Sequence, residues 1–598
     1  MKRQDIDKKY KWDLSDLYKS FNEVEEDIKK IPKMIEKVAS YKGKLLESSE
    51  TLWQFIKSTR ETEEIIEKLD VFCFLLVDVE MDNKDAKKYG DKVDNIITEY
   101  QTATAYVIPE LLAADYEVIE KLISEKEELK VLEKWFKELY RAKEHTLSER
   151  EESILSTNQM ISSNFGKSST FITDKEIDYG EIEVNGENVK LMASNLNLYA
   201  VHEDRNVRKQ VYNNERSAIG SHIDSLATNY ISFIKSCEAE AKFRGFNSYL
   251  EQVFYSKNLD IKVYDTLKSS VLKYKSNYIK FVQLLKKALG YDEIKPYDLN
   301  APIVKESSKK YTVEEAKEII LDTYSFLGEK YIDTLTYAFT HGSIDYFPCE
   351  NKSTGWSSIY SPYTKPRVFA NYEGKILDIS SLCHELGHFC NQFMIIENQL
   401  PEYVYQATFC AEVSSLTNEI LFANIFKDKE EDKSTKAAIL YNFIKIFISN
   451  FFGASKQALF EERTHTLANK GEALSSDVLC DIWLDIHNEV CGDEVNDVSP
   501  YVWAEIPHFF LGGGYYCYNY STAIIAACNV AHKLLTNEDG FKEKYMKYLT
   551  IGSSETPLDS LMLLGIDMTD SKVYDVAMEM FDKALSELYE LLETNEVK

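Results

Sequence analysis

Apolar residues recur along much of this chain at the three- and four-residue spacing of an amphipathic helix. Eleven prolines and 22 glycines in 598 residues leave long stretches that nothing interrupts. The pattern therefore predicts a mainly α-helical fold. The clearest series are Leu52, Phe55, Ile56, Ile66 and Leu69, and Leu132, Trp135, Phe136 and Leu139.

The alternation of apolar and polar residues that is typical of a β-strand is clear at one place. Ile182-Glu183-Val184 and Val189-Lys190-Leu191 flank Asn185-Gly186, a dipeptide that favours the tight turn of a hairpin. We place a domain boundary there. Residues 1–195 are predicted to form a helical N-terminal region that ends in the hairpin, and residues 196–598 to form a catalytic region with a small sheet that includes residues 368–372.

Composition indicates a soluble protein with a large core, since 44% of the residues are hydrophobic. The net charge of −29 argues against a general affinity for nucleic acid or anionic membranes. The first ten residues lack the apolar centre of a signal peptide, and the ten cysteines form no C-x-x-C pair. A cytoplasmic protein with reduced thiols and no nucleic-acid or membrane partner is predicted.

The strongest candidate for chemistry is the pentapeptide His384-Glu385-Leu386-Gly387-His388. Two histidines four residues apart project from one face of a helix, and two imidazoles so placed are suited to one Zn²⁺. The glutamate between them is suited to act as general base on a water molecule. Asp378 and Ser380 are helix-start residues, and no proline occurs in residues 376–400, so a helix is expected to run through the motif. The alternative is a helix whose histidines only pair with neighbours.

A zinc site of this kind needs a third protein ligand. Apolar residues spaced along residues 403–422 predict an amphipathic helix, and Glu412 and Glu419 lie seven residues apart on one side of it. They form either a solvated acidic edge or a source of the missing carboxylate. Beside a histidine pair, a ligand role for Glu412 is favoured, with at most a supporting role for Glu419. Cys383 and Cys390 flank the motif and are expected to be core residues rather than ligands.

Several segments together resemble the oligoendopeptidase F family of zinc oligopeptidases, relatives of thimet oligopeptidase. They are Lys11 to Tyr18 with its Trp-Asp-Leu element, Pro366 to Tyr372, Ser381 to His388, and Ala411 to Ser415. The resemblance implies one Zn²⁺ per chain, held by His384, His388 and Glu412, with Glu385 as general base. It also implies an elongated, two-lobed helical zincin with a deep substrate channel, and an active-site edge strand at residues 366–372.

A second constellation follows downstream, where His508 precedes three glycines and Tyr515, Tyr516, Tyr518 and Tyr520. Hydrolysis of a peptide bond develops negative charge on the carbonyl oxygen, which O–H and N–H donors stabilise. The resemblance implies that this histidine and tyrosine cluster binds and polarises that carbonyl. We expect His508, Tyr515 and Tyr518 to take this role, with Tyr516 as a further candidate.

The sequence as a whole predicts a zinc endopeptidase that cleaves short, unstructured peptides bound in extended form beside residues 369–372. One alternative is a zinc aminopeptidase, for which no Gly-x-Met-Glu-Asn element to grip a free amine is found. The other is a non-catalytic peptide-binding protein, which is expected to have lost Glu385 or a ligand. Cleavage of an N-terminally blocked peptide separates the three. The oligomeric state and the preferred cleavage site are left open by the sequence.

Overall fold

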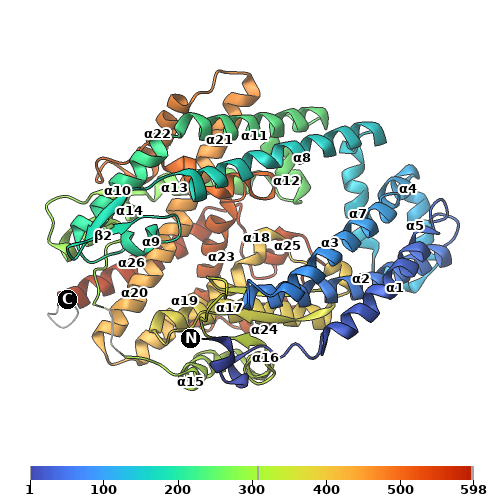
Figure 1. Cartoon of the computed structure of the whole chain (residues 1–598), viewed down its shortest axis with the longest axis horizontal. Coiled ribbons are helices and arrows are strands. Elements are labelled where there is room, and N and C mark those ends of the chain that lie inside the picture. Colours follow the sequence, from blue (N-terminus) through green and yellow to red (C-terminus); the bar gives the residue numbers. More distant parts are fainter. Residues whose placement is uncertain (1, 306–308, 594–598) are drawn as a thin grey trace.

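The computed structural model describes residues 2–305 and 309–593. Long helices form most of these ranges, and the strands belong to two small sheets, so the mainly α-helical prediction is confirmed. Figure 1 shows α1, α2 and α3 (Phe21–Ala39, Ser49–Val79 and Lys84–Thr104) packed side by side at one end of the molecule. It also shows α8 (Glu149–Phe171) running alongside α11 (Ile223–Phe243) across the upper side.

The remaining elements follow in chain order. Up to residue 300 the further α-helices are α4 (Val107–Ala113), α5 (Tyr116–Ser124), α6 (Glu127–Lys130), α7 (Glu133–Arg141), α9 (Leu196–Ala200), α10 (Arg205–Gly220), α12 (Tyr249–Ser256), α13 (Lys262–Lys273) and α14 (Lys275–Leu289). After it come α15 (Val313–Tyr324), α16 (Glu329–Thr340), α17 (Ile376–Asn398), α18 (Thr408–Ala411), α19 (Val413–Lys429), α20 (Lys433–Phe447), α21 (Ala454–Lys470), α22 (Ser476–Cys491), α23 (Tyr518–Leu535), α24 (Phe541–Tyr548), α25 (Pro557–Met562) and α26 (Lys572–Leu592).

Short 3-10 and π-helical turns connect several of these helices. They are η1 (Arg3–Asp5), η2 (Lys8–Tyr10), η3 (Ala142–His145), η4 (Ile172–Glu176), η5 (Pro296–Asp298), η6 (Ser325–Leu327), η7 (Pro401–Tyr403), η8 (Ile448–Gly453), η9 (Val502–Glu505) and η10 (Pro507–Gly513).

The predicted apolar stripes face the core of their helices. In α2, Leu52, Phe55, Ile56, Ile66 and Leu69 are all buried, and Ser48 begins the helix by accepting the N–H of Thr51. The same holds for Leu132 and Phe136 around the start of α7. Because these side chains lie on one face, burial in a neighbouring helix layer stabilises each helix more than its intrinsic propensity does.

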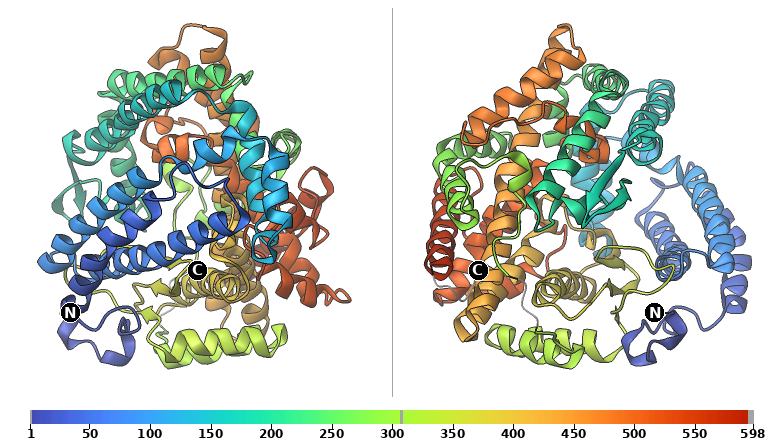
Figure 2. Two further views of the ribbon diagram at one scale, coloured as in Figure 1. Left: turned by 90° about the vertical axis from the view of Figure 1, so that its right-hand side faces the viewer. Right: turned by 60° about the vertical axis from the view of Figure 1, so that its left-hand side comes forward.

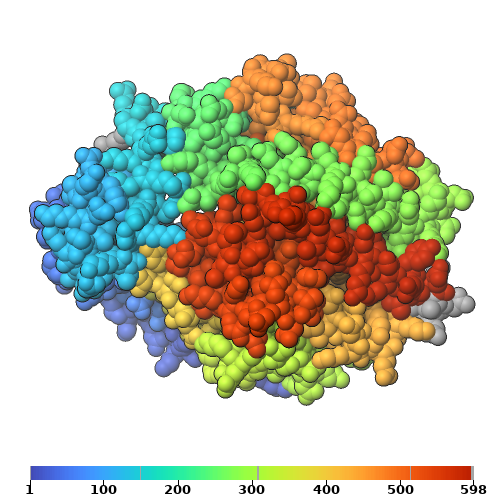
Figure 3. Space-filling model, turned by 180° about the vertical axis from the view of Figure 1, so that it is seen from behind, coloured from blue at the N-terminus to red at the C-terminus, as the bar shows by residue number. Residues whose placement is uncertain are grey.

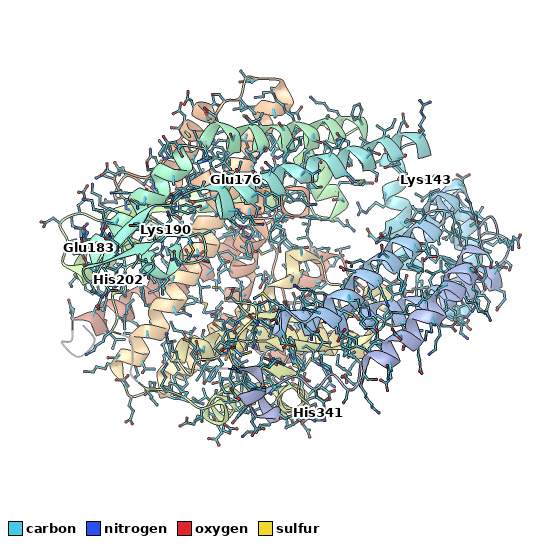
Figure 4. All side chains as sticks on the ribbon, in the orientation of Figure 1. Lys143, Glu176, Glu183, Lys190, His202 and His341 are labelled. Carbon is cyan, nitrogen blue, oxygen red and sulfur yellow. The ribbon has the colours of Figure 1, made fainter. Side chains whose placement is uncertain are left out.

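The predicted hairpin is confirmed as β1 (Glu181–Val184) and β2 (Glu187–Lys190), which pair in antiparallel register around Asn185-Gly186. Both turn residues have positive φ, 53° and 84°, as such a two-residue turn requires. Figure 4 labels Glu183 and Lys190 of the hairpin at the opposite end of the molecule from Lys143. A hydrophobic cluster joins Ile182 to Val207 across residue 195, and the domain boundary placed there stays a prediction.

A three-stranded sheet lies beside the catalytic motif, with strand order β3-β5-β4. Its strands are β3 (Ile344–Asp345), β4 (Ser357–Ser361) and β5 (Thr364–Phe369). The N-terminal segment is bonded to this sheet: Arg3 forms an ion pair with Asp345 at 2.6 Å, and the Trp12 indole donates to Val368 O at 2.9 Å. These two contacts attach the N-terminal segment to the sheet, and Figure 2 shows the helices that follow it, in blue, as a group at one side.

The main core gathers α17, α19, α20, α21, α23 and α26 into one hydrophobic cluster. One continuous helical stretch, Lys433–Lys470, is long and apolar enough to span a membrane, but more than half of its most apolar part is buried against the rest of the protein. We assign it as a core helix for that reason. All ten cysteines are free thiols, and Cys383 and Cys390 are fully buried core residues as predicted. Figure 3 shows the C-terminal segment, in red, covering the centre of the rear face.

Candidate active site

The histidine pair is carried by α17, which runs through the motif as predicted. Asp378 begins the helix by accepting the N–H groups of Glu373 and Lys375, at 2.8 and 2.9 Å. His384 and His388 project from the same face, and their ring centroids lie 5.0 Å apart. Because the opposite face of α17 is buried in the core, the two imidazoles have a fixed direction.

Glu412 completes a group of three donors. The predicted helix over 403–422 is in fact broken: α18 ends at Ala411 and α19 begins at Val413, so Glu412 sits at the junction between them. Its Oε2 lies 3.4 Å from His384 Nε2 and 3.2 Å from His388 Nε2. Ser415 donates its hydroxyl to the same oxygen at 2.9 Å, which fixes the carboxylate in place.

Gly387 allows α17 and α19 to come close enough for this convergence. A Cβ at position 387 would lie 2.6 Å from Ser415 Cα and 2.7 Å from Ser414 O, far inside normal contact distance. A glycine directly before His388 is therefore required by packing against α19, the helix that begins after Glu412. The sequence pattern alone gave no reason for this glycine.

The three donors fit Zn²⁺. In a tetrahedral site with bonds of about 2.1 Å, donor atoms lie about 3.4 Å apart, close to the distances found here. His384 Nδ1 lies 3.2 Å from Glu419 Oε2, and Glu419 also accepts the Ser380 hydroxyl at 3.0 Å. A proton on Nδ1 leaves the Nε2 lone pair free for a metal, which is the usual carboxylate–histidine arrangement around zinc. The supporting role predicted for Glu419 is consistent with this geometry.

The electrostatics of the group depend on burial and on these contacts. Burial lowers the pKa of His384, but its bonds to Glu412 and Glu419 outweigh burial and leave the pKa well above the usual value. Burial raises the pKa of Glu412, but the two imidazoles outweigh it and leave the pKa well below the usual range. The cluster thus holds a carboxylate directly against nitrogen donors, as a cation site requires.

Glu385 lies next to the donor group with one oxygen unused. Its side chain is buried, and Oε2 has no hydrogen-bond partner within the described part of the chain. Burial raises the pKa of Glu385, and the neighbouring histidines oppose that rise without cancelling it. A carboxyl whose pKa is raised and whose oxygen is free is suited to take up and return a proton.

All four residues line a pocket of about 360 Å³. Its walls come from β4 and the residue before it, from the later turns of α17 and from the segment before Glu412. The lining residues are Trp356, Ser357, Ser358, Tyr360, His384, Glu385, His388, Asn391, Gln392, Ile395, Gln406, Ala411 and Glu412.

The strand that faces this pocket differs from the one predicted. Residues 366–372 were expected to form the edge strand, but β5 is the central strand, paired with β3 on one side and β4 on the other. The edge belongs to β4, whose Ser357, Ser358 and Tyr360 line the pocket. The apolar run Val368-Phe369-Ala370 is buried because its alternate side chains pack into two hydrophobic clusters: Val368 and Ala370 into the main core, and Phe369 into the cluster of Trp12.

The downstream constellation divides into two faces. His508 Nε2 lies 3.3 Å from the Tyr520 hydroxyl, and the Tyr516 ring lies 6.0 Å from His508 and 5.5 Å from Tyr520. The negative charge of Glu412 is among the causes, after burial, that raise the pKa of Tyr520, which relates this cluster to the donor group. Burial lowers the pKa of His508, so its imidazole is neutral at neutral pH.

Tyr515 and Tyr518 do not belong to this face, which corrects the expectation for both. Tyr515 is 1% exposed and Tyr518 0%, and the two rings pack among aromatic side chains of the core. The physical reason is helical geometry: Tyr518 and Tyr520 both lie in α23, and side chains two residues apart on a helix point to nearly opposite sides. Tyr516 lies before the helix and packs its ring against Tyr520. The alternation of Tyr516, Tyr518 and Tyr520 suggested one shared face, as in a strand. Treating residues 518–520 as the start of a helix would have separated Tyr520 from Tyr518.

The fold and the site define a metalloendopeptidase, and comparison with known proteins gives its family. The chain belongs to peptidase family M3, whose model matches residues 198–580, and a second model, described as oligopeptidase F, matches residues 110–173. The chain is 28% identical to the oligopeptidase PepF of Bacillus subtilis, over 99% of this chain and 88% of that protein. It is also 28% identical to an oligoendopeptidase F homolog of Lactococcus lactis, over 99% and 98% of the two chains.

Solved structures agree with this assignment. A peptidase structure from Chlamydophila abortus has a TM-score of 0.89 and 28% identity, and covers 99% of both chains. Oligoendopeptidase-F from Enterococcus faecium has the same fold, with a TM-score of 0.75 and 24% identity over 96% of this chain and 99% of that one. The predicted resemblance to the oligoendopeptidase F family is confirmed.

Proposed function

We propose that this metalloendopeptidase uses one Zn²⁺ per chain to hydrolyse internal bonds of short, unstructured peptides, with Glu385 as general base. The observation that carries the proposal is the convergence of His384, His388 and Glu412, all within 4.8 Å of one another, beside the buried Glu385. Loss of a ligand or of the base is what a non-catalytic relative would be expected to show, and all four residues are present.

His384, His388 and Glu412 would hold the zinc ion, and Glu419 and Ser415 would fix two of these ligands. When bound, zinc would lower the pKa of a water molecule and polarise the substrate carbonyl. Glu385 takes the proton of the attacking water on its free oxygen and later delivers it to the nitrogen of the leaving amine. Its raised pKa and its free oxygen favour the uptake of that proton.

The substrate lies in extended form along β4. In the described residues β5 is the only strand that pairs with β4. The backbone N–H and C=O groups on the other edge of β4 are therefore free to bond a peptide next to the pocket. The hydroxyl of Tyr520 and the imidazole of His508, which contact each other, donate to the carbonyl oxygen as negative charge develops there. Tyr516 lies against both rings and completes this face.

The remaining features of the proposal concern shape and setting. Residues 1–195 and the catalytic region would form two lobes on either side of a deep channel, which admits peptides and excludes folded proteins. A cytoplasmic location is part of the proposal, and the ten free thiols favour it. Neither nucleic acid nor membrane is a proposed partner.

A short peptide with both ends blocked and a fluorophore–quencher pair tests the function. Wild-type protein should cleave it at an internal bond, lose activity with a chelator and regain it with Zn²⁺, while Glu385→Gln serves as the matched inactive control. An aminopeptidase would refuse this substrate and cut only the version with a free N-terminus. A peptide-binding protein would bind it without cleavage, and either result would overturn the proposal.

A further inference from the structure

The segment that carries His508, Tyr516 and Tyr520 is held from behind by two helices. Phe509 packs against Phe460 of α21 and Tyr230 of α11, with ring centroids 5.3 and 5.4 Å apart. Tyr515 packs against His465 of α21 at 4.8 Å. Within this short segment Phe509 and Tyr515 therefore face the core, whereas His508, Tyr516 and Tyr520 face the proposed substrate.

The backbone takes a rare conformation over the three residues that end at Tyr515. Gly513 and Gly514 have φ values of 88° and 99°, and Tyr515, which has a side chain, has φ of 49°. Residues other than glycine adopt this left-handed region at a cost, so a specific contact is needed to hold Tyr515 there.

That contact is a hydrogen bond to Glu461 of α21. The N–H of Tyr515 donates to Glu461 Oε1 at 2.6 Å, and the Glu461 side chain is 1% exposed. Its other oxygen has no partner among the described residues, so the carboxyl serves no ion pair of its own. Burial raises the pKa of Glu461 to about 8, and the Tyr515 N–H and the charge of Lys257 only partly oppose that rise.

Burial of a carboxyl that has a single backbone partner lowers the free energy of unfolding, and an apolar side chain of the same size would not have this cost. The directional bond is what an apolar side chain cannot supply. It holds the backbone of Tyr515, which lies between the end of η10 at Gly513 and the start of α23 at Tyr518. The rings of Tyr516 and Tyr520 follow directly from that helix start.

We propose that Glu461 is a positioning residue of the peptidase reaction, which acts through the Tyr515 N–H to place His508, Tyr516 and Tyr520 opposite the metal-binding group. The proposal rests on the proposed function of those three side chains. It assigns Glu461 no contact with substrate or metal.

The test compares three variants of the full chain. Glu461→Met removes the acceptor at similar size, Glu461→Gln keeps an acceptor oxygen, and Glu462→Met makes the same change at the neighbouring residue, whose partner is Lys268 on the surface side. For folded, zinc-loaded protein, Glu461→Met should lower kcat by about 10- to 100-fold with KM nearly unchanged. Glu461→Gln should stay within about threefold of wild type, and Glu462→Met should match wild type.

Hydrogen exchange gives a readout that does not depend on activity. The Tyr515 amide should exchange faster in Glu461→Met than in wild type, and Glu461→Gln should restore its protection. Each of three results would overturn the proposal. They are a wild-type kcat in Glu461→Met, an equal loss of kcat in Glu461→Met and Glu461→Gln, and unchanged hydrogen exchange at Tyr515 in Glu461→Met. If Glu461→Met does not fold, Glu461→Gln carries the test alone: a kcat far below wild type with Tyr515 still protected overturns it.

A double variant separates this inference from the proposed function. Because Glu461 is proposed to place Tyr520 together with His508 and Tyr516, the Met substitution should lower kcat by a smaller factor in Tyr520→Phe than in wild type. If the factors by which Glu461→Met and Tyr520→Phe lower kcat simply multiply in the double variant, the positioning role is overturned. Normal turnover by Tyr520→Phe alone would instead overturn the role proposed for Tyr520, and the exchange measurement would still decide whether Glu461 orders the segment.

Discussion

Replacing Gly387 with alanine tests whether the close approach of α17 and α19 builds the metal site. The new Cβ would lie 2.6 Å from Ser415 Cα, whereas carbon atoms normally approach to about 3.5 Å, so the two helices must separate by about 0.9 Å. Ser415 supports Glu412 through its hydroxyl, and Glu412 directly precedes α19. The carboxylate would therefore move away from the histidines by more than the ~0.2 Å that metal bonds tolerate.

Two measurable consequences follow. Zinc affinity, measured by competition with a chelator, should fall roughly 10- to 100-fold, as it does when the support of a zinc ligand is lost. The metal-free protein should also lose stability, because overpacking costs about 1–3 kcal/mol and the better helix propensity of alanine returns only about 1 kcal/mol. Activity should fall with zinc occupancy at limiting metal.

Gly90→Ala is the matched control, since Gly90 lies inside α3 and the nearest atom to its new Cβ is Cys73 Cβ at 4.0 Å. That variant should keep its zinc affinity and melt at the same temperature or slightly higher. If Gly387→Ala behaved like Gly90→Ala in both assays, the packing argument would be refuted.

Five further substitutions have defined outcomes. Glu385→Gln should retain zinc by elemental analysis but lower kcat by roughly 10²–10⁴, and near-normal turnover would exclude it as the base. Tyr520→Phe should lower kcat by about 10²–10³ with little change in KM, whereas Tyr518→Phe should keep both kcat and the melting temperature, because the Tyr518 hydroxyl is buried without a partner among the described residues. Glu419→Ala should weaken zinc binding by about 10- to 100-fold while zinc-saturated enzyme stays active. Folding raises the pKa of Glu461 from 4.5 to about 8. Between these two pH values the native state keeps a proton that the unfolded chain has lost. The contribution of Glu461 to the free energy of unfolding therefore falls as the pH rises from 4.5 to 8. Glu461→Gln should therefore gain stability relative to wild type over that window, and a pH-independent difference in denaturant titrations would contradict the assignment.

Features that depend on nearby residues were predictable from the sequence. The helix through His384 and His388 follows from spacing, helix-start residues and the lack of proline, and the hairpin follows from alternation around Asn185-Gly186. The likeness of several separate segments to one family gave the fold class, and the family assignment confirms it.

Features that depend on which segments meet were decided only by the tertiary structure. Both β4 and β5 are short strands, and pairing with β3 makes β5 central and leaves β4 at the pocket. Tyr516, Tyr518 and Tyr520 are chemically alike, and the start of α23 determines which of them face His508. Gly387 and Glu461 lie in ordinary helical sequence, and their importance comes from atoms of distant segments: the backbone of Ser415 and the N–H of Tyr515. Local patterns record the preferences of a chain for helix, turn and strand, whereas contacts of this kind arise from packing between elements and leave no periodic signal in one sequence.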